Sequence, residues 1–325
     1  MQQAQLSGWL ERRLGVPLVA RAAVGGGCIH QAWALDLADG RRLFAKTNRL
    51  EALPLLQAEA DGLAALAAVG SALVLPEPIA CEALGDRALL LMGWLPLAGA
   101  ACGWGGGPGS GAGAVASAPQ SSGWAAAAAG ARSDPDQAWG RFGEALADLH
   151  HRSLAGSDGR FGWSGDNFIG SGPQANGWLA GWGQFFAERR LAPQLALAAQ
   201  AGRPLRQGEA LLARLPGWLD QHGAEPCLVH GDLWAGNGSL LVDGRGAIFD
   251  PAVYRGDREV DLAMAQLFGG FPARFFAGYA SRWPLPPGHQ ERREIYNLYH
   301  LLNHANLFGG GYWRQAQACI DALLR

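Results

Sequence analysis

Apolar residues in the first hundred positions of this chain recur with two different periods. They alternate with polar residues, or form short runs, over residues 18–24, 29–37, 42–46, 76–83 and 87–92, with turn residues such as Asp39-Gly40 between segments. Such segments predict β-strands. Residues 51–69 instead carry leucines at 53, 56, 63 and 66, the spacing of an amphipathic helix. We expect residues 1–97 to form a small N-terminal lobe of five antiparallel strands and one helix.

The pattern changes after residue 97. Residues 98–134 consist mainly of Ala, Gly and Ser, and such a segment buries too little apolar surface to offset the entropy of the chain. We interpret it as a low-complexity insertion that the fold does not need. Helical periodicity returns over residues 138–151, 177–191, 205–222, 259–268 and 291–306. Residues 135–325 are therefore expected to form a larger, mainly helical lobe.

Three short apolar runs interrupt the helices of this second lobe. Residues 227–230, 239–243 and 247–250 predict strands, and the turn sequence Asp243-Gly244-Arg245-Gly246 joins the last two as a hairpin. A hairpin brings the chain back to its starting point. We therefore expect Asp250, at the end of the hairpin, to lie beside Asn237, which precedes it.

The residues from His230 to Asn237, read His-Gly-Asp-Leu-Trp-Ala-Gly-Asn, carry the clearest chemical signal. Phosphoryl transfer to a hydroxyl requires a carboxylate that accepts the proton, here Asp232, and an amide and a second acid that hold Mg²⁺, here Asn237 and Asp250. The protein-kinase signature is H-R-D-x-x-x-x-N followed by D-F-G, and Gly231 replaces its Arg. A polar loop beside an unrelated hairpin is the alternative.

Candidates for binding the nucleotide lie in the first lobe. Gly25, Gly26 and Gly27 stand between two predicted strands, where backbone N–H groups could approach phosphates, although a tight turn explains them equally. Lys46, the only Lys of the chain, ends the third strand, as does the phosphate-binding Lys of protein kinases. Glu59 falls on the inward face of the predicted helix and is the expected partner of Lys46. A solvated edge position is the alternative for Glu59.

A predicted hinge segment and a cysteine are further candidate sites in the first lobe. Met92, Gly93 and Trp94 end the fifth strand, where a hinge between the lobes would offer backbone groups to adenine. Cys28 follows the three glycines, and backbone N–H groups there would lower the pKa of its thiol. We hypothesise that Cys28 is redox-sensitive; a small side chain buried under the strand is the alternative.

Composition narrows the class of protein. A net charge of −2 and 49% hydrophobic residues provide no basic excess for nucleic acid or an anionic membrane surface. The five Cys residues contain no C-x-x-C pair, which favours a reducing compartment. The N-terminus lacks the basic and apolar regions of a signal peptide. We expect a cytoplasmic monomer or homodimer without nucleic acid or membrane partners.

With these residues in view, the chain resembles the fructosamine kinase (ketosamine-3-kinase) family of kinase-like phosphotransferases. The matching stretches span nearly the whole chain outside 98–134: residues 25–29, 161–163, 166–170, 173–178, 185–189, 230–237, 249–252, 261–264, 268–271 and 299–304. The resemblance implies an α+β, two-lobed, protein-kinase-like fold. It also implies ATP- and Mg²⁺-dependent phosphorylation of the 3-hydroxyl of ketosamines, on a free amine or a protein side chain, which reverses glycation. Gly93-Trp94 departs from the Glu-containing pair common at the hinge of the family.

The resemblance also implies roles for single residues. Asp261 is expected to be buried and to accept backbone N–H groups of the catalytic loop. Trp234 is placed to stack on the acceptor, and a core position is the alternative. Asn167 could bind sugar hydroxyls, unless turn chemistry explains it. His300 could line the acceptor pocket or pack between helices; a zinc site with His304 lacks the general base and a third ligand.

Two other classes of function remain possible at this point. A choline- or aminoglycoside-type phosphotransferase would use the same machinery on a cationic acceptor, but the second lobe has no dense acidic run. A catalytically silent nucleotide-binding protein would be expected to lose the base, the metal ligands or the Lys, and this chain keeps all three.

Overall fold

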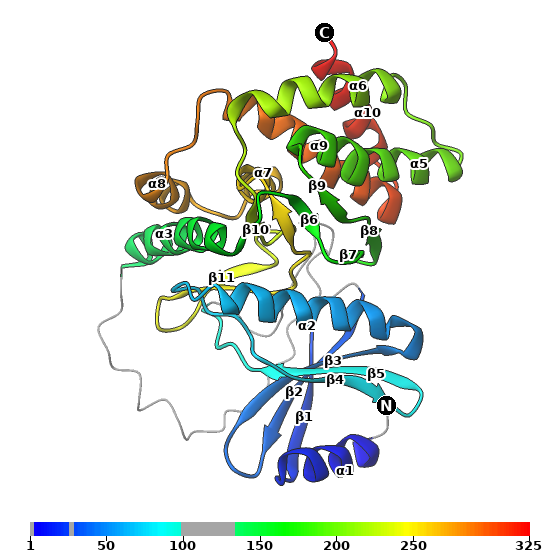
Figure 1. The fold of residues 1–325 in the computed structure, drawn as a ribbon. Helices are drawn as coiled ribbons and strands as arrows, with labels where there is room; N and C mark the ends of the chain where they lie inside the picture. The colour runs from blue at the N-terminus through cyan, green and yellow to red at the C-terminus, as the bar shows by residue number, and fades with distance from the viewer. Residues whose placement is uncertain (1–2, 26–28, 99–133) are drawn as a thin grey trace.

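The computed structural model describes residues 3–25, 29–98 and 134–325. The expectations for Gly26, Gly27 and Cys28, and for residues 99–133 of the predicted insertion, lie outside the described residues. Figure 1 shows a smaller sheet-containing lobe and a larger mainly helical lobe, with helix α2 (Leu53–Ala68) between the sheet and the second lobe. The predicted two-lobed α+β fold is confirmed.

The N-terminal lobe is built on a five-stranded antiparallel sheet, as predicted. The strands lie in the order β1-β2-β3-β5-β4. Their bounds are Leu18–Val24 for β1, Gln31–Leu37 for β2, Arg42–Arg49 for β3, Pro78–Leu84 for β4 and Arg87–Gly93 for β5. The predicted segments overlap all five strands, and a short 3-10 turn, Leu50–Ala52, leads from β3 into α2.

Helices cover both faces of this sheet (Figure 1). Side chains alternate along a strand, so neighbouring residues of β3 and β5 reach opposite faces. Leu43, Ala45, Leu89 and Leu91 share a cluster with α1 (Gln3–Leu14), whereas Phe44, Leu90 and Met92 share one with α2. Burial on both faces explains why residues 88–92 form an unbroken apolar run. Helix α1 was not predicted, although Leu6, Trp9 and Leu10 follow a helical spacing.

The C-terminal lobe holds the other helices and several short strands. The helices are α3 (Pro135–Ser153), α4 (Trp182–Phe185) continued by a π-helix (Phe186–Leu191), α5 (Ala192–Gln200), α6 (Gly208–Leu219), α7 (Glu259–Leu267), α8 (Ala273–Arg282), α9 (His289–Phe308) and α10 (Tyr312–Leu323), with 3-10 turns at Leu154–Gly156 and Asp220–His222. A four-stranded sheet has the order β10-β13-β6-β9, from Cys227–Val229, Tyr254–Gly256, Phe161–Trp163 and Gly177–Leu179. Two hairpins pair β7 (Asn167–Ile169) with β8 (Gly172–Gln174), and β11 (Gly238–Leu240) with β12 (Gly246–Ile248).

Part of this lobe differs from the elements that the sequence predicted. The predicted helix over 177–191 begins as strand β9, and the helix starts only at Trp182. Gly177 has φ +91°, which suits glycine in a turn into a strand and not a residue within a helix. Helices α5, α8 and α10 were not predicted.

Helices α3 and α8 pack with their backbones in close contact at Gly143. A Cβ atom added at Gly143 would lie 1.9 Å from the carbonyl oxygen of Phe275. We predict that Gly143→Ala destabilises the protein, because overpacking a core typically costs about 1–3 kcal/mol. Gly217→Ala in α6 is the matched control: nothing lies within 4 Å of its added Cβ, so alanine there should be neutral or stabilising. Equal melting temperatures of the two variants would contradict this interpretation.

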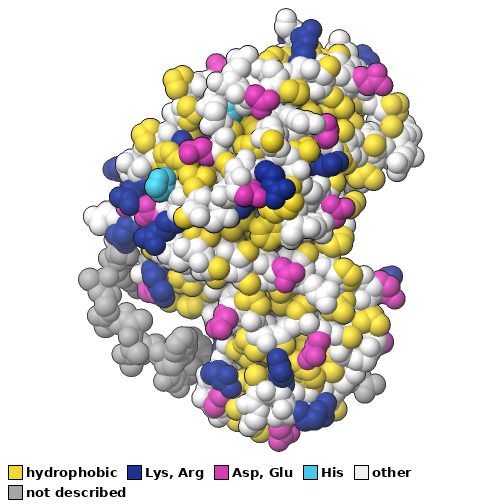
Figure 2. All heavy atoms as spheres, in the orientation of Figure 1, with side chains coloured by type: hydrophobic (Ala, Val, Ile, Leu, Met, Phe, Trp, Pro, Cys, Tyr) yellow, Lys and Arg dark blue, Asp and Glu magenta, His cyan; other side chains and the backbone are white. Residues whose placement is uncertain are grey.

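No helix in the described part of the chain is long and apolar enough to cross a membrane. Figure 2 shows Lys and Arg together with Asp and Glu in both lobes of the face that it presents, in keeping with the small net charge.

Candidate active site

The β11–β12 hairpin brings the second predicted acid back to the catalytic loop. Gly238 pairs with Ile248, and the N–H of Phe249 donates to the carbonyl of Asn237 at 3.0 Å. The side-chain amide of Asn237 lies 3.5 Å from the carbonyl oxygen of Asp250. The expectation that Asp250 lies beside Asn237 is confirmed.

Lys46 joins the two lobes at this point. Its ammonium donates to Glu59 Oε1 at 2.8 Å and also contacts Asp250 Oδ1. The predicted Lys46–Glu59 pair is therefore present, and both side chains are buried. Burial would lower the pKa of Lys46, but the carboxylates of Asp250 and Glu59 outweigh it and raise the pKa above its ordinary value. Lys46 therefore keeps its positive charge.

Asp250 has an unusual backbone. Its φ of +57° is one of two positive values among the described non-glycine residues. Such conformations are sparsely populated, and where they occur they often serve a functional site. Here the conformation follows the hairpin and directs the carboxylate towards Lys46.

Asp232 is the candidate proton acceptor. Its Oδ2 accepts a hydrogen bond from Asn237 Nδ2 at 3.1 Å. Burial, reinforced by the negative charge of Asp250, raises the pKa of Asp232 to about 7, and the bond from Asn237 opposes this shift. A base whose pKa lies near the working pH suits general-base catalysis.

We predict a pH dependence from this shift. If Asp232 must be ionised to accept a proton, kcat/KM should fall on the acid side with a midpoint near 7, far above the ordinary pKa of Asp, since kcat/KM reports ionisations of the free enzyme. The measurement is kcat/KM for ATP from pH 5 to 9. A profile that stays flat down to pH 5 would contradict the shifted base.

A buried carboxylate holds the catalytic loop. Asp261, in the first turn of α7, accepts the N–H groups of His230 at 2.7 Å and Gly231 at 2.8 Å, as expected. His150 Nε2 donates to it at 3.0 Å from α3. Burial alone would raise the pKa of Asp261, but the hydrogen bonds from His150 and from the backbone N–H of His230 help to hold it below its ordinary value. His150 was not predicted as a partner of this loop, because a single His within an amphipathic helix gives no distinct signal.

His230 ties the catalytic loop to the segment before Asp250. Its Nε2 donates to the carbonyl of Phe249 at 2.9 Å, and its Nδ1 lies 3.3 Å from the N–H of Asp232, from which it accepts. One donating and one accepting nitrogen define a neutral imidazole. Burial also lowers the pKa of His230. His230 thus connects the backbone at Asp232 to the residue before Asp250.

Gly231 is needed where protein kinases have Arg. Its φ is +80°, and a Cβ atom there would lie 2.1 Å from the carbonyl oxygen of Ala252. The N–H of Ala252 donates to the carbonyl of His230 at 2.8 Å, so the two backbone segments lie too close for a side chain.

The donor atoms fit a magnesium ion. Asp250 offers a carboxylate beside the ammonium of Lys46, and burial raises the pKa of both Glu59 and Asp232 to about 7. Asn237 directs its Nδ2 to Asp232, and no described residue donates to its Oδ1. Carboxylate and amide oxygens are the ligands that Mg²⁺ prefers. Asn237 and Asp250 are therefore the candidates for holding it.

Met92 and Trp94, two of the hinge candidates, share a hydrophobic cluster with Phe249, the residue before Asp250. Met92 is fully buried and pairs with Phe44. The N–H of Gly93 donates to the carbonyl of Glu77 at 2.9 Å, so this donor is already used. The Trp94 ring lies 6.2 Å from that of Phe44, measured between centroids. Gly25 lies at the end of β1, before the residues that are not described.

Asn167 is part of a buried network. It is 6% exposed, its Nδ2 donates to the carbonyl of Val253 at 2.8 Å, and its Oδ1 accepts from Gln174 at 2.9 Å and Asn176 at 2.8 Å. Gln174 also donates to the carbonyl of Ala252 at 3.0 Å. These bonds hold the β7–β8 hairpin against the segment that follows Asp250. The geometry favours this structural role over binding of sugar hydroxyls.

Two other substrate candidates differ in accessibility. Trp234 is partly buried, and its ring covers Gly236, where an added Cβ would lie 2.3 Å from ring carbons. It remains a candidate for stacking on an acceptor. His300 is 2% exposed in α9, and burial lowers its pKa to about 3. Its position favours the helix-packing alternative.

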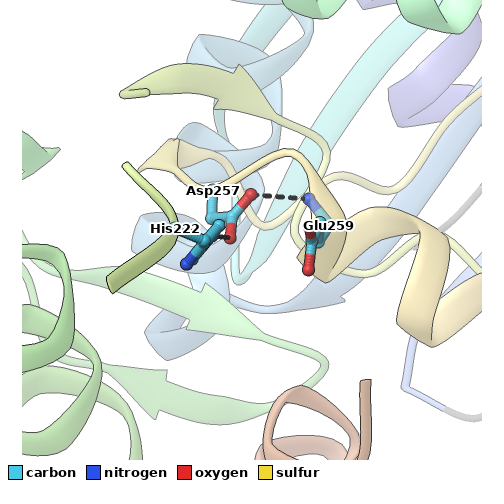
Figure 3. Close-up of side chains that lie close together, drawn as sticks. All are labelled: His222, Asp257 and Glu259. Carbon is cyan, nitrogen blue, oxygen red and sulfur yellow. Dashed lines mark hydrogen bonds and ion pairs between the residues drawn. The ribbon is translucent and has the colours of Figure 1, made fainter. Parts of the chain in front are cut away.

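A second cluster of ionisable groups, His222, Asp257 and Glu259, lies outside the catalytic loop (Figure 3). Its potential ligand atoms lie within 4.8 Å of one another. However, Asp257 already accepts bonds from His222 and from the Tyr296 hydroxyl, both at 2.6 Å. Both Glu259 oxygens pair with Arg292, at 2.7 and 2.8 Å. A metal ion would have to displace these partners, so we interpret the cluster as a structural ion-pair network.

Comparison with known proteins bears directly on this geometry. The family model described as fructosamine kinase matches residues 2–104 and 129–325. A probable ketoamine kinase from Synechocystis sp. is 41% identical over 306 residues, which cover 94% of this chain and 90% of that protein. The chain belongs to the fructosamine kinase family. As a member, it is a kinase that uses ATP. The family match omits residues 105–128, within the segment that the sequence analysis set apart as an insertion.

Solved structures share the fold of this family member. A candidate fructosamine-3-kinase from Thermobifida fusca is 30% identical, with a TM-score of 0.75, and the alignment covers 98% of both chains. One from Haemophilus somnus is 25% identical with a TM-score of 0.79, covering 98% of this chain and 97% of that one. The resemblance stated from the sequence is confirmed over nearly the whole chain.

Proposed function

We propose that this protein transfers the γ-phosphoryl group of ATP to the 3-hydroxyl of a ketosamine, the rearranged product of a sugar with an amine. The observation that carries the proposal is the grouping of Asp232, Asn237, Asp250 and Lys46 in a chain of the fructosamine kinase family. The matched relative, a probable ketoamine kinase, supports the acceptor class.

The residues have distinct tasks in this reaction. Asp232 accepts the proton of the 3-hydroxyl while the hydroxyl oxygen bonds to the γ-phosphorus. The bond from that phosphorus to the β–γ bridging oxygen breaks, and ADP leaves. Lys46 would bind the phosphates, while Asn237 and Asp250 would hold Mg²⁺. Mg²⁺, when bound, neutralises the charge of the phosphates.

Apolar side chains from both lobes support an adenine site beside Lys46. One hydrophobic cluster contains Val24, Met92 and Trp94 from the N-terminal lobe and Leu241 and Phe249 from the C-terminal lobe. We propose that adenine lies against this cluster, near the hinge. The ATP requirement, together with the free state of Cys81, Cys227 and Cys319, supports a cytoplasmic location.

ADP release in the presence of Mg²⁺ tests the proposal directly. Fructosamines, ribulosamines and erythrulosamines are offered as free amines and as glycated lysine in a protein, with choline and an aminoglycoside as controls. We expect turnover with at least one ketosamine, with ³¹P NMR locating the phosphate on the 3-oxygen. Turnover with choline or the aminoglycoside alone would support the alternative phosphotransferase instead.

A further inference from the structure

His30 stands at the entrance of β2, on the side of the sheet that carries Lys46. The β2–β3 pairing sets Ala32 opposite Lys46 and Gln31 opposite Thr47, so His30 continues beside Asn48. Because side chains alternate along a strand, Lys46 and Asn48 point to the same face. His30 therefore shares the face of the predicted phosphate-binding lysine.

The orientation of the Asn48 amide defines the tautomer of His30. Asn48 Oδ1 accepts the N–H of Arg49 at 2.8 Å, and its Nδ2 donates to the carbonyl of Ile29 at 3.1 Å. These backbone partners leave no choice as to which end of the amide is nitrogen. Nδ2 also lies 2.9 Å from His30 Nδ1, which must accept because an amide nitrogen can only donate. The neutral ring therefore carries its proton on Nε2.

The surroundings keep this ring neutral and leave its donor available. Burial, and then the positive charge of Lys46, lower the pKa of His30 to about 4, and the carboxylate of Asp250 opposes the shift. The two charges that act on the His30 ring, those of Lys46 and Asp250, both belong to the candidate active site. Within the part of the chain that the structure describes, no group forms a hydrogen bond with His30 Nε2, and the ring's hydrogen bond is made by Nδ1.

Both lobes hold the segment that carries His30. At the tip of the β7–β8 hairpin, a Cβ atom added to Gly170 would lie 3.5 Å from Ile29 Cδ1 and 3.5 Å from Leu307 Cδ1. The residue before His30 therefore lies against the second lobe, and Asn48 holds the same residue from β3. A side chain positioned in this way has few orientations to lose when it binds a ligand.

We propose that His30 is a phosphate-binding residue whose Nε2–H donates a hydrogen bond to the terminal phosphate of the nucleoside triphosphate. This inference rests on the proposed function, because it assumes that the phosphates lie beside Lys46. A neutral imidazole can donate a hydrogen bond to a phosphate oxygen without adding a positive charge that would itself need a partner. Donors that are oriented in advance towards developing charge are effective in catalysis. His30 was not among the predicted site residues, because its tautomer depends on Asn48.

Kinetics of two variants test the role. His30→Gln keeps an N–H close to the position of Nε2, whereas His30→Met fills similar space without a donor. Loss of one stabilising donor typically lowers kcat on the order of 10²–10³-fold. We expect His30→Met to approach this loss, His30→Gln to recover at least part of it, and KM for the ketosamine to stay within about threefold. Equal activity of both variants and the parent, or a rise only in KM for the ketosamine, would overturn the proposal.

A binding measurement separates this inference from the proposed function. In ¹⁵N-labelled protein, the His30 side-chain signals are assigned by their loss in His30→Gln, and the parent is titrated with Mg²⁺ and either a non-hydrolysable ATP analogue or ADP. The Nε2–H signal should shift with the analogue and not with ADP. Equal shifts with both nucleotides would overturn the contact with the terminal phosphate. A selective shift without any ketosamine turnover would sustain the contact and refute the acceptor.

Discussion

Asp232→Asn should retain ATP binding and lose most turnover. The amide keeps the size of the carboxylate but cannot accept the proton of the acceptor hydroxyl, and removing a general base typically costs on the order of 10²–10⁴-fold. Asp243→Asn, in the exposed turn of the β11–β12 hairpin, is the matched control and should leave turnover unchanged. Calorimetry and steady-state rates check the two halves of the prediction. Activity within a few-fold of the parent would remove Asp232 from the role of base.

The same variant should be no less stable than the parent at pH 8. The pKa of Asp232 is raised in the folded protein, so the folded state binds a proton more readily than the unfolded chain does. Ionising Asp232 therefore costs stability progressively as the pH rises from about 4 to about 7, and the full cost is present above 7. An uncharged amide avoids this cost. A large drop in melting temperature would show that the carboxylate has a structural role instead.

Asp250→Asn should abolish the dependence of nucleotide binding on Mg²⁺. Asn tolerates the positive φ of this position better than most residues, so the backbone should persist while the charged ligand is lost. Even residues that only support a metal ligand cost about 10–100-fold in metal affinity when mutated, so losing the ligand itself should cost at least as much.

Calorimetry with ATP, in Mg²⁺ and in EDTA, checks this prediction. The parent should bind ATP more tightly in Mg²⁺, and Asp250→Asn should bind it similarly in both. Asp243→Asn again provides the control, as an acid of the same hairpin. If Asp250→Asn keeps the full effect of Mg²⁺, the metal is held elsewhere.

Much of this arrangement could be predicted because it depends on local signals. The periods of two and 3.6 located all five strands and α2, and the turn at residues 243–246 brought Asp250 to Asn237. The Lys46–Glu59 pair followed from an acid on an apolar helix face. Helix α8 was not predicted, although its buried residues Phe275, Gly278 and Tyr279 follow a helical spacing.

The roles of several residues were decided only by the tertiary structure. Asn167 was a candidate for binding sugar hydroxyls, with turn chemistry as the alternative, but its side chain donates to the carbonyl of Val253, 86 residues along the chain. His150 meets Asp261 across 111 residues, and no pattern within α3 indicates the contact. Burial and hydrogen-bond partners arise where distant segments meet, so they are not encoded in any one segment. By itself, the sequence determined the two lobes and the candidate residues of the catalytic loop, because periodicity and motif spacing are local. Only the packed structure determined which polar side chains remain free for a substrate, because their partners come from elsewhere in the chain.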